Sequence, residues 1–126
     1  MDDRLGEGRR IAELLASEVE GHGDELAPLS VGDADRDVEP TSEGALAYRV
    51  VHDDGERVAT VYVHPDRVRI EFAVAQEAVA AAAESAGLRV RPKATKPPRT
   101  LVFVESGAEV KRTLPAFAAA ADAHSD

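Results

Sequence analysis

Apolar and polar residues alternate along the middle of the chain, in three short runs between Ala45 and Ala73 that two turns separate. Alternation with a period of two is typical of a β-strand with one buried and one exposed face. The first turn contains Asp54-Gly55, a strong hairpin signal, and the second contains Pro65-Asp66, in which proline presets a turn conformation. This stretch therefore predicts three consecutive antiparallel strands.

The first turn also fixes the register of the predicted sheet, because Asp53 then pairs with Glu56. One face carries the apolar side chains of Leu46, Tyr48, Val50, Ala59, Val61, Val63, Val68, Ile70 and Phe72. The other face carries Arg49, Val51, Val58, Thr60, Tyr62, His64, Arg67, Arg69 and Glu71. The apolar face needs a cover, and we expect the second face to meet solvent or a partner.

Three other segments have apolar residues at helical spacing along one side only, namely 7–20, 74–86 and 106–121. Gly8 weakens the start of the first helix, since glycine costs about 1 kcal/mol relative to alanine. Pro115 either kinks the last helix or begins a second one from its first turn. Narrow apolar stripes suit helices that dock on a sheet, so we expect these helices to cover the apolar face.

Two further strands are expected in the second half of the chain. Leu88–Arg91 alternates until Pro92 stops it, and Thr100–Val104 is apolar on both sides, as in a well-buried strand. Earlier in the chain, residues 26–31 either form a short strand or anchor a loop.

The element order α-β-β-β-α-β-β-α predicts an α+β fold over residues 1–126 as a single domain, with a mostly antiparallel sheet of about five strands and three helices on one face. Two connections stand out in composition, an acidic loop at 22–44 and a basic, proline-rich loop at 92–99. The element order resembles that of the small YjbR-type domains, whose members are often described as DNA-binding-like. This resemblance carries over no functional residue.

The chain has 24 acidic and 15 basic residues, a formal net charge of −9, and only three lysines. This composition resembles that of cytosolic proteins from haloarchaea, whose cytoplasm is rich in salt. So much like charge destabilises a compact state unless it is screened, and at about 1 M salt the Debye length falls to about 3 Å. We therefore expect a halophilic protein whose fold is stabilised by salt.

The sequence contains no cysteine, which excludes disulfides, thiolate metal sites and cysteine nucleophiles. Its N-terminal residues lack the basic and apolar regions of a secretion signal, and no apolar run is long enough for a membrane span. These patterns predict a cytoplasmic protein that makes no membrane contact.

Asp33, Asp35 and Asp37 have the spacing of the first three ligands in an EF-hand calcium loop. The match then ends, because Val38 stands where the loop needs glycine and Gly44 where it needs glutamate. We therefore expect a solvated acidic loop and no metal site.

Two histidines could act as general bases, because His52 is followed by Asp53, and Asp66 lies close to His64. Neither pair has a nucleophile or an oxyanion donor close to it in the sequence. The sequence also lacks G-x-S-x-G and the Gly-rich phosphate-binding motifs. We therefore expect no enzyme activity and no cofactor.

Positive charge is concentrated between Arg89 and Arg99, where five basic residues and no acid occur. Removing these five from the total of −9 leaves −14 on the rest of the chain. Basic residues with an aromatic among them are favoured by single-stranded nucleic acid and by phosphorylated ligands. The candidate anion-binding or nucleic-acid-binding surface comprises Arg49, Tyr62, His64, Arg67, Arg69, Arg89, Arg91, Lys93, Lys96 and Arg99.

The main functional hypothesis from the sequence is a small, non-enzymatic domain with an interaction or binding role. One alternative is binding of nucleic acid or another anionic ligand at the candidate surface. Another is a structural homodimer, formed either through Val51, Val58 and Tyr62 or through an exposed edge strand.

Overall fold

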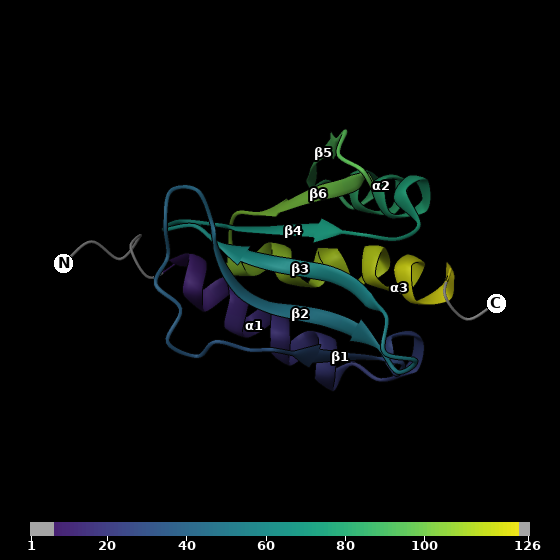
Figure 1. Ribbon diagram of the computed structural model, residues 1–126, viewed down its shortest axis with the longest axis horizontal. Coiled ribbons are helices and arrows are strands. Elements are labelled where there is room, and N and C mark those ends of the chain that lie inside the picture. The colour runs from purple at the N-terminus through teal and green to yellow at the C-terminus, as the bar shows by residue number, and fades with distance from the viewer. Residues whose placement is uncertain (1–6, 124–126) are drawn as a thin grey trace.

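The computed structural model describes residues 7–123 (Figure 1). A helix and a short strand precede three consecutive strands, and a helix, two strands and a last helix follow. The elements are α1 (Glu7–Gly21), the 3₁₀-helix η2 (Asp24–Leu26), β1 (Leu29–Gly32), β2 (Ala45–His52), β3 (Arg57–Val63), β4 (Val68–Phe72), α2 (Gln76–Ser85), β5 (Arg89–Lys93), β6 (Arg99–Val104), the 3₁₀-helix η3 (Gly107–Thr113) and α3 (Leu114–Ala123).

The six strands form one sheet in the order β1-β2-β3-β4-β6-β5, and every neighbouring pair is antiparallel. Helices α1, α2 and α3 lie on one side of this sheet, and no helix of the described chain covers the other side (Figure 1). The predicted α+β fold is confirmed. The sheet has six strands because residues 29–32 pair along β2 as an edge strand, rather than anchoring a loop.

The register predicted for the three central strands is confirmed at the middle of the sheet. Tyr48 pairs with Val61, Val61 pairs with Ile70, and Val50 pairs with Ala59. Eight of the nine side chains predicted on the covered face are buried, namely Tyr48, Val50, Ala59, Val61, Val63, Val68, Ile70 and Phe72.

A β-bulge in β2 changes the position of the ninth side chain. Ala47 is the extra residue, so Leu46 pairs with Tyr62 instead of with Val63. An extra residue moves the neighbouring side chain to the opposite face of the strand. The prediction that Leu46 faces the helices is therefore wrong.

A second bulge lies in β3, where Val50 pairs with Ala59 but Val51 pairs with Arg57. The residue left between these pairs is Val58, which is fully buried. The prediction that Val58 lies on the exposed face is wrong, and the apolar patch proposed for a homodimer loses one of its three members.

The core lies between the sheet and the helices. Phe72 of β4 and Phe117 of α3 are fully buried, and their ring centroids are 5.0 Å apart in a tilted arrangement that aromatic pairs favour. Helix α1 contributes Ile11, Leu15 and Val19, one residue from each successive turn. Leu14, which the helical spacing places on the same stripe, is 41% exposed, so the spacing identified the buried face of α1 except at Leu14.

Pro115 lies in the first turn of a helix, and Pro92 lies in an edge strand of the sheet. Helix η3 ends at Thr113, and α3 begins at Leu114 with Pro115 in its first turn, so the segment is split and not kinked. The predicted stop at Pro92 is wrong, because β5 continues to Lys93. Proline is tolerated there because β5 is an edge strand.

Helix α1 begins directly against the turn between β3 and β4. The amide nitrogen of Gly8 lies 3.3 Å from the carbonyl oxygen of Pro65. A Cβ atom at this position would overlap the carbonyl oxygen of His64 and lie 2.7 Å from that of Arg67. The glycine that lowers helix propensity is therefore also the residue that lets the helix approach the turn.

Candidate functional site

The side of the sheet opposite the helices is called the uncovered face (Figure 1). The strand pairing places two rows of side chains across it. Residues that pair across neighbouring strands lie side by side on the same face. The first row is Leu46, Tyr62, Arg69, Phe103 and Arg89, and the second is Arg49, Thr60, Glu71, Leu101 and Arg91. Aromatic and basic side chains therefore alternate along the first row from β3 to β5.

Arg69 is held in place near the middle of the uncovered face. Its guanidinium carbon lies 4.5 Å from the centre of the Tyr62 ring, and its Nε donates to Glu71 Oε2 at 3.0 Å. Its Nη1 donates to the carbonyl oxygen of Glu43 at 3.1 Å and lies 3.2 Å from His64 Nε2. With these partners, Arg69 acts as a structural link between strands.

His64 is buried, although the sequence placed it on the exposed face. Its Nδ1 lies 3.1 Å from the carbonyl oxygen of Ser42, and its Nε2 faces Arg69. A carbonyl only accepts and a guanidinium only donates, so the imidazole is neutral and carries its proton on Nδ1. Burial lowers the pKa of His64; the charges of Arg67 and Arg69 act in the same direction, and the Ser42 hydrogen bond and Asp66 oppose them.

The lowered pKa of His64 makes stability depend on pH. Between about pH 6.5 and the lowered pKa, the unfolded chain binds a proton that the folded chain does not, so stability falls as the pH drops. We expect the urea midpoint to fall between about pH 7.5 and pH 5, and His64→Gln to remove part of that fall, because glutamine does not titrate. The same pH dependence in both proteins would contradict a neutral, buried His64.

A cavity of about 410 Å³ opens on the uncovered face towards the β5 edge. It is lined by Asp66, Arg67, Arg89, Arg91, Phe103 and Glu105. The guanidinium carbon of Arg89 lies 5.7 Å from the centre of the Phe103 ring, and Arg67 Nη1 lies 3.1 Å from Asp66 Oδ1. An aromatic ring thus lies among three guanidinium groups and two carboxylates.

The remaining candidate cations lie around these two clusters. Arg49 pairs at 3.3 Å with a carboxylate of the acidic loop, and Lys93 Nζ lies 3.7 Å from Glu71 Oε1. Arg99 donates to the carbonyls of the two prolines that precede it, and Lys96 is exposed in the same loop. The ten candidates thus form three groups, which are the cavity arginines Arg67, Arg89 and Arg91, the Arg69 cluster with Tyr62 and His64, and the flanking cations Arg49, Lys93, Lys96 and Arg99.

Phe103 and Glu105 are not among the candidate residues predicted from the sequence. Strand 100–104 is not buried on both sides as predicted, because Leu101 and Phe103 are only half-buried, on the uncovered face. Pairing 89–93 with 99–103 as a hairpin would have placed Phe103 beside Arg89. The available signal was therefore the proline-rich turn between two strands of matching length.

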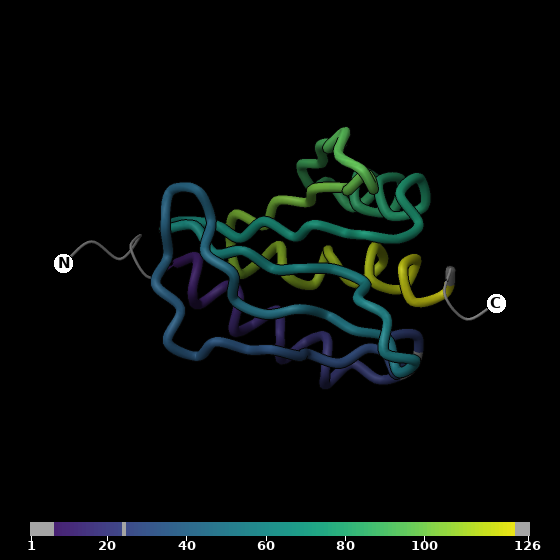
Figure 2. The backbone as a smooth tube through the Cα atoms, in the orientation of Figure 1, coloured from purple at the N-terminus to yellow at the C-terminus, as the bar shows by residue number. Residues whose placement is uncertain are grey.

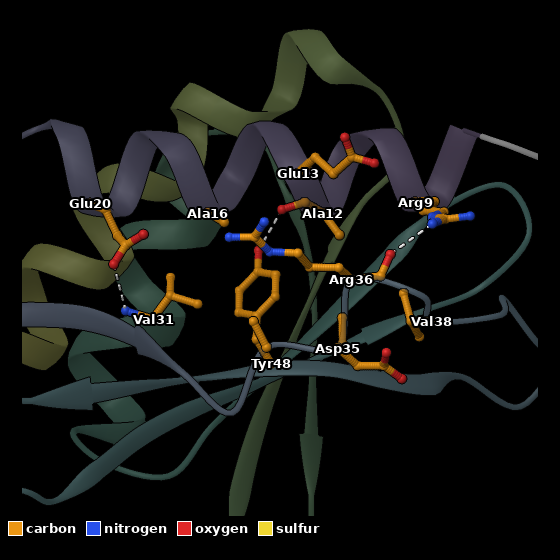
Figure 3. Close-up of a pocket in the computed structure, with 12 residues that line it drawn as sticks. Arg9, Ala12, Glu13, Ala16, Glu20, Val31, Asp35, Arg36, Val38 and Tyr48 are labelled. Atoms are coloured by element: carbon orange, nitrogen blue, oxygen red, sulfur yellow. Dashed lines mark hydrogen bonds between the residues drawn. The ribbon is translucent and has the colours of Figure 1, made fainter.

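A second cavity, of about 400 Å³, lies between α1 and the loop after β1 (Figure 3). Its inner wall includes Ala12, Ala16 and Tyr48, and the Tyr48 hydroxyl donates to the carbonyl oxygen of Ala12 at 2.7 Å. Burial, reinforced by the charge of Glu20, raises the pKa of Tyr48 well above its usual range. Tyr48 is therefore neutral near neutral pH.

The loop that joins β1 to β2 runs past the beginning of α1 (Figure 2). Arg9 donates to the carbonyl oxygen of Arg36 at 2.7 Å, and Asp35 Oδ1 accepts from the amide of Asp37 at 3.0 Å. Asp33 pairs with Arg49 instead of converging with the other two aspartates. Within residues 7–123, no group of three or more histidine, cysteine or acidic side chains is placed to hold a metal ion.

The second histidine candidate, His52, is buried at the end of β2. Its Nδ1 lies 2.9 Å from Asp53 Oδ1 and 3.3 Å from the amide nitrogen of Asp54. The imidazole is thus tied to the turn that follows its own strand.

None of the helices in the described part of the chain combines the length and the apolar character that a membrane crossing needs. Neither the curated proteins nor the solved structures contain a match to this chain. A family model described as a family of unknown function, DUF7993, matches residues 1–126, and the chain therefore belongs to that family.

Proposed function

We propose that this protein is a non-enzymatic binding domain that holds an anionic ligand on the uncovered face of its sheet. The observation that carries the proposal is the convergence of Arg67, Arg89 and Arg91 on one cavity of an otherwise acidic protein. Guanidinium groups bind carboxylate and phosphate oxygens through paired, charge-assisted hydrogen bonds.

The ion pairs of the individual arginines support a ligand site at Arg89 and Arg91. Arg49, Arg67 and Arg69 each pair with a carboxylate, but no carboxylate of the described residues pairs with Arg89 or Arg91. Both are exposed on the edge strand β5, where an incoming ligand meets little obstruction. Of the three cavity arginines, Arg89 and Arg91 are therefore the two whose guanidinium groups are not paired with a described carboxylate.

The negative net charge of the protein limits how many phosphates a ligand can place against its surface. At −9 the protein repels polyanions as a whole, so binding must depend on short-range contacts inside the cavity. Screening by salt weakens the long-range repulsion, but it also weakens the attraction between arginine and phosphate. We therefore expect a ligand that makes a few contacts, not an extended electrostatic footprint.

Charge reversal at the cavity tests the proposal. Arg89→Glu/Arg91→Glu should abolish retention on phosphocellulose at moderate salt, because it replaces the two uncommitted guanidinium groups by carboxylates. The matched control is Lys111→Glu/Arg112→Glu, which makes the same change in net charge at two exposed residues of η3, on the helix side. Failure of the wild type to be retained, or equal loss in both variants, would overturn the proposal.

A further inference from the structure

We infer that the anionic ligand is an unpaired nucleic-acid strand, one base of which stacks at Phe103 while the neighbouring phosphates pair with the cavity arginines. This inference rests on the function proposed above and specifies its ligand class. It depends on the juxtaposition of one accessible aromatic ring, three guanidinium groups and two carboxylates in a single cavity.

Phe103 and Tyr62 lie in the same row and are both half-buried, but they differ in how closely an arginine covers the ring. Arg69 stacks on Tyr62 at 4.5 Å and is fixed there by Glu71 and by backbone contacts. Arg89 lies farther from Phe103, at 5.7 Å, and no described carboxylate holds it there. A base can therefore stack at Phe103 or on the open plane of the Arg89 guanidinium, whereas Tyr62 is already capped.

The carboxylates of Asp66 and Glu105 indicate which kind of anion the cavity can bind. Asp66 and Glu105 line the same cavity as the arginines, so a ligand made only of phosphates would meet repulsion beside its attraction. A nucleotide carries phosphate oxygens for the arginines and also N–H or O–H donors, which a carboxylate accepts. Mixed charge around a ring thus favours a nucleotide over inorganic polyphosphate.

The shape of the face favours a single strand over a duplex. Bases stack on an aromatic side chain only when they are unpaired and splayed out, and exposed sheets with aromatic residues recognise nucleic acid in this way. Reading a duplex through its major groove requires a helix or a two-stranded ribbon that enters the groove. The uncovered face offers no helix among the described residues, and its β5–β6 hairpin is part of the six-stranded sheet instead of a separate ribbon.

The experiment compares two fluorescent strands of about twelve nucleotides, a thymidine oligonucleotide and an abasic oligonucleotide with the same phosphates and no bases. We expect the wild type to bind the thymidine strand at least about fivefold more tightly, because one of its bases stacks on Phe103 and the abasic strand has no base to stack. With three cavity arginines in contact, the slope of log K against log salt should be about −2. Equal affinity for the two strands would overturn the inference.

Variants separate this inference from the proposed function. Phe103→Leu should remove the preference for the thymidine strand, whereas Tyr62→Leu, in the same row, should keep it. If both strands bind equally and Arg89→Glu/Arg91→Glu abolishes both interactions, the site recognises phosphate alone, and only the inference fails. If the wild type binds neither strand, nor phosphocellulose, both proposals fail.

Discussion

Replacing Gly8 by alanine is expected to lower the free energy of unfolding by about 3 kcal/mol, even though alanine is the better helix former. The added methyl group would overlap the carbonyl oxygen of His64 and press on that of Arg67. Both contacts are backbone atoms of a tight turn, so neither can rotate away as a side chain would. The first turn of α1 must therefore move off the sheet.

Gly21 provides the matched control at the other end of the same helix. An added Cβ there would meet nothing within 4 Å, so Gly21→Ala should leave stability unchanged or raise it by up to about 1 kcal/mol. Urea unfolding followed by circular dichroism gives both values. Equal stability of the Gly8→Ala variant and the wild type would mean that α1 does not rest on the turn between β3 and β4.

Replacing Phe72 by alanine is expected to cost about 4 kcal/mol, which is a large fraction of the stability of a domain of this size. The Phe72 ring is fully buried and packs 5.0 Å from that of Phe117. Its removal leaves a cavity between β4 and α3 as well as the lost transfer free energy of the ring. The variant should unfold at a much lower urea concentration than the wild type.

Phe103→Ala removes the same side chain from the opposite face of the sheet. Phe103 is half-buried and has no helix over it, so we expect a loss of about 1 kcal/mol. Comparable losses in the two variants would contradict the assignment of covered and uncovered faces.

The sequence predicted the central sheet well because two independent signals agree there. Period-two alternation assigns the faces, and the turns set the pairing of Tyr48 with Val61 and of Val61 with Ile70. Both signals are local, so no knowledge of the rest of the chain is needed.

The bulges could not be predicted in the same way. The first turn contains three residues, 53–55, and is closed by the His52 amide and the Glu56 carbonyl oxygen at 2.8 Å. The extra residue Val58 then restores the pairing expected for a two-residue turn. A three-residue turn with a bulge at Val58 therefore gives the same pairing of Val50 with Ala59 as a two-residue turn without a bulge. The alternation of apolar and polar residues does not distinguish between these two arrangements.

The candidate site was predicted only in part, because its members come together through long-range pairing. The basic character of β5 is visible in the sequence, but the position of Phe103 beside Arg89 depends on the hairpin of β5 and β6. The hydrogen bond that orients His64 is made to Ser42, which lies 22 residues earlier in the chain. Residue type suggested the chemistry, and tertiary structure determined which residues remain accessible.

Successive residues of β6 point to opposite faces of the sheet. Val102 and Val104 lie in the core, and Phe103, which stands between them in the sequence, lines the cavity on the uncovered face. Substitutions at Phe103, Arg89 or Arg91 therefore leave the apolar layer beneath them intact. The same separation of the two faces makes the uncovered face a practical starting point for engineering, because its side chains can be exchanged without disturbing the core.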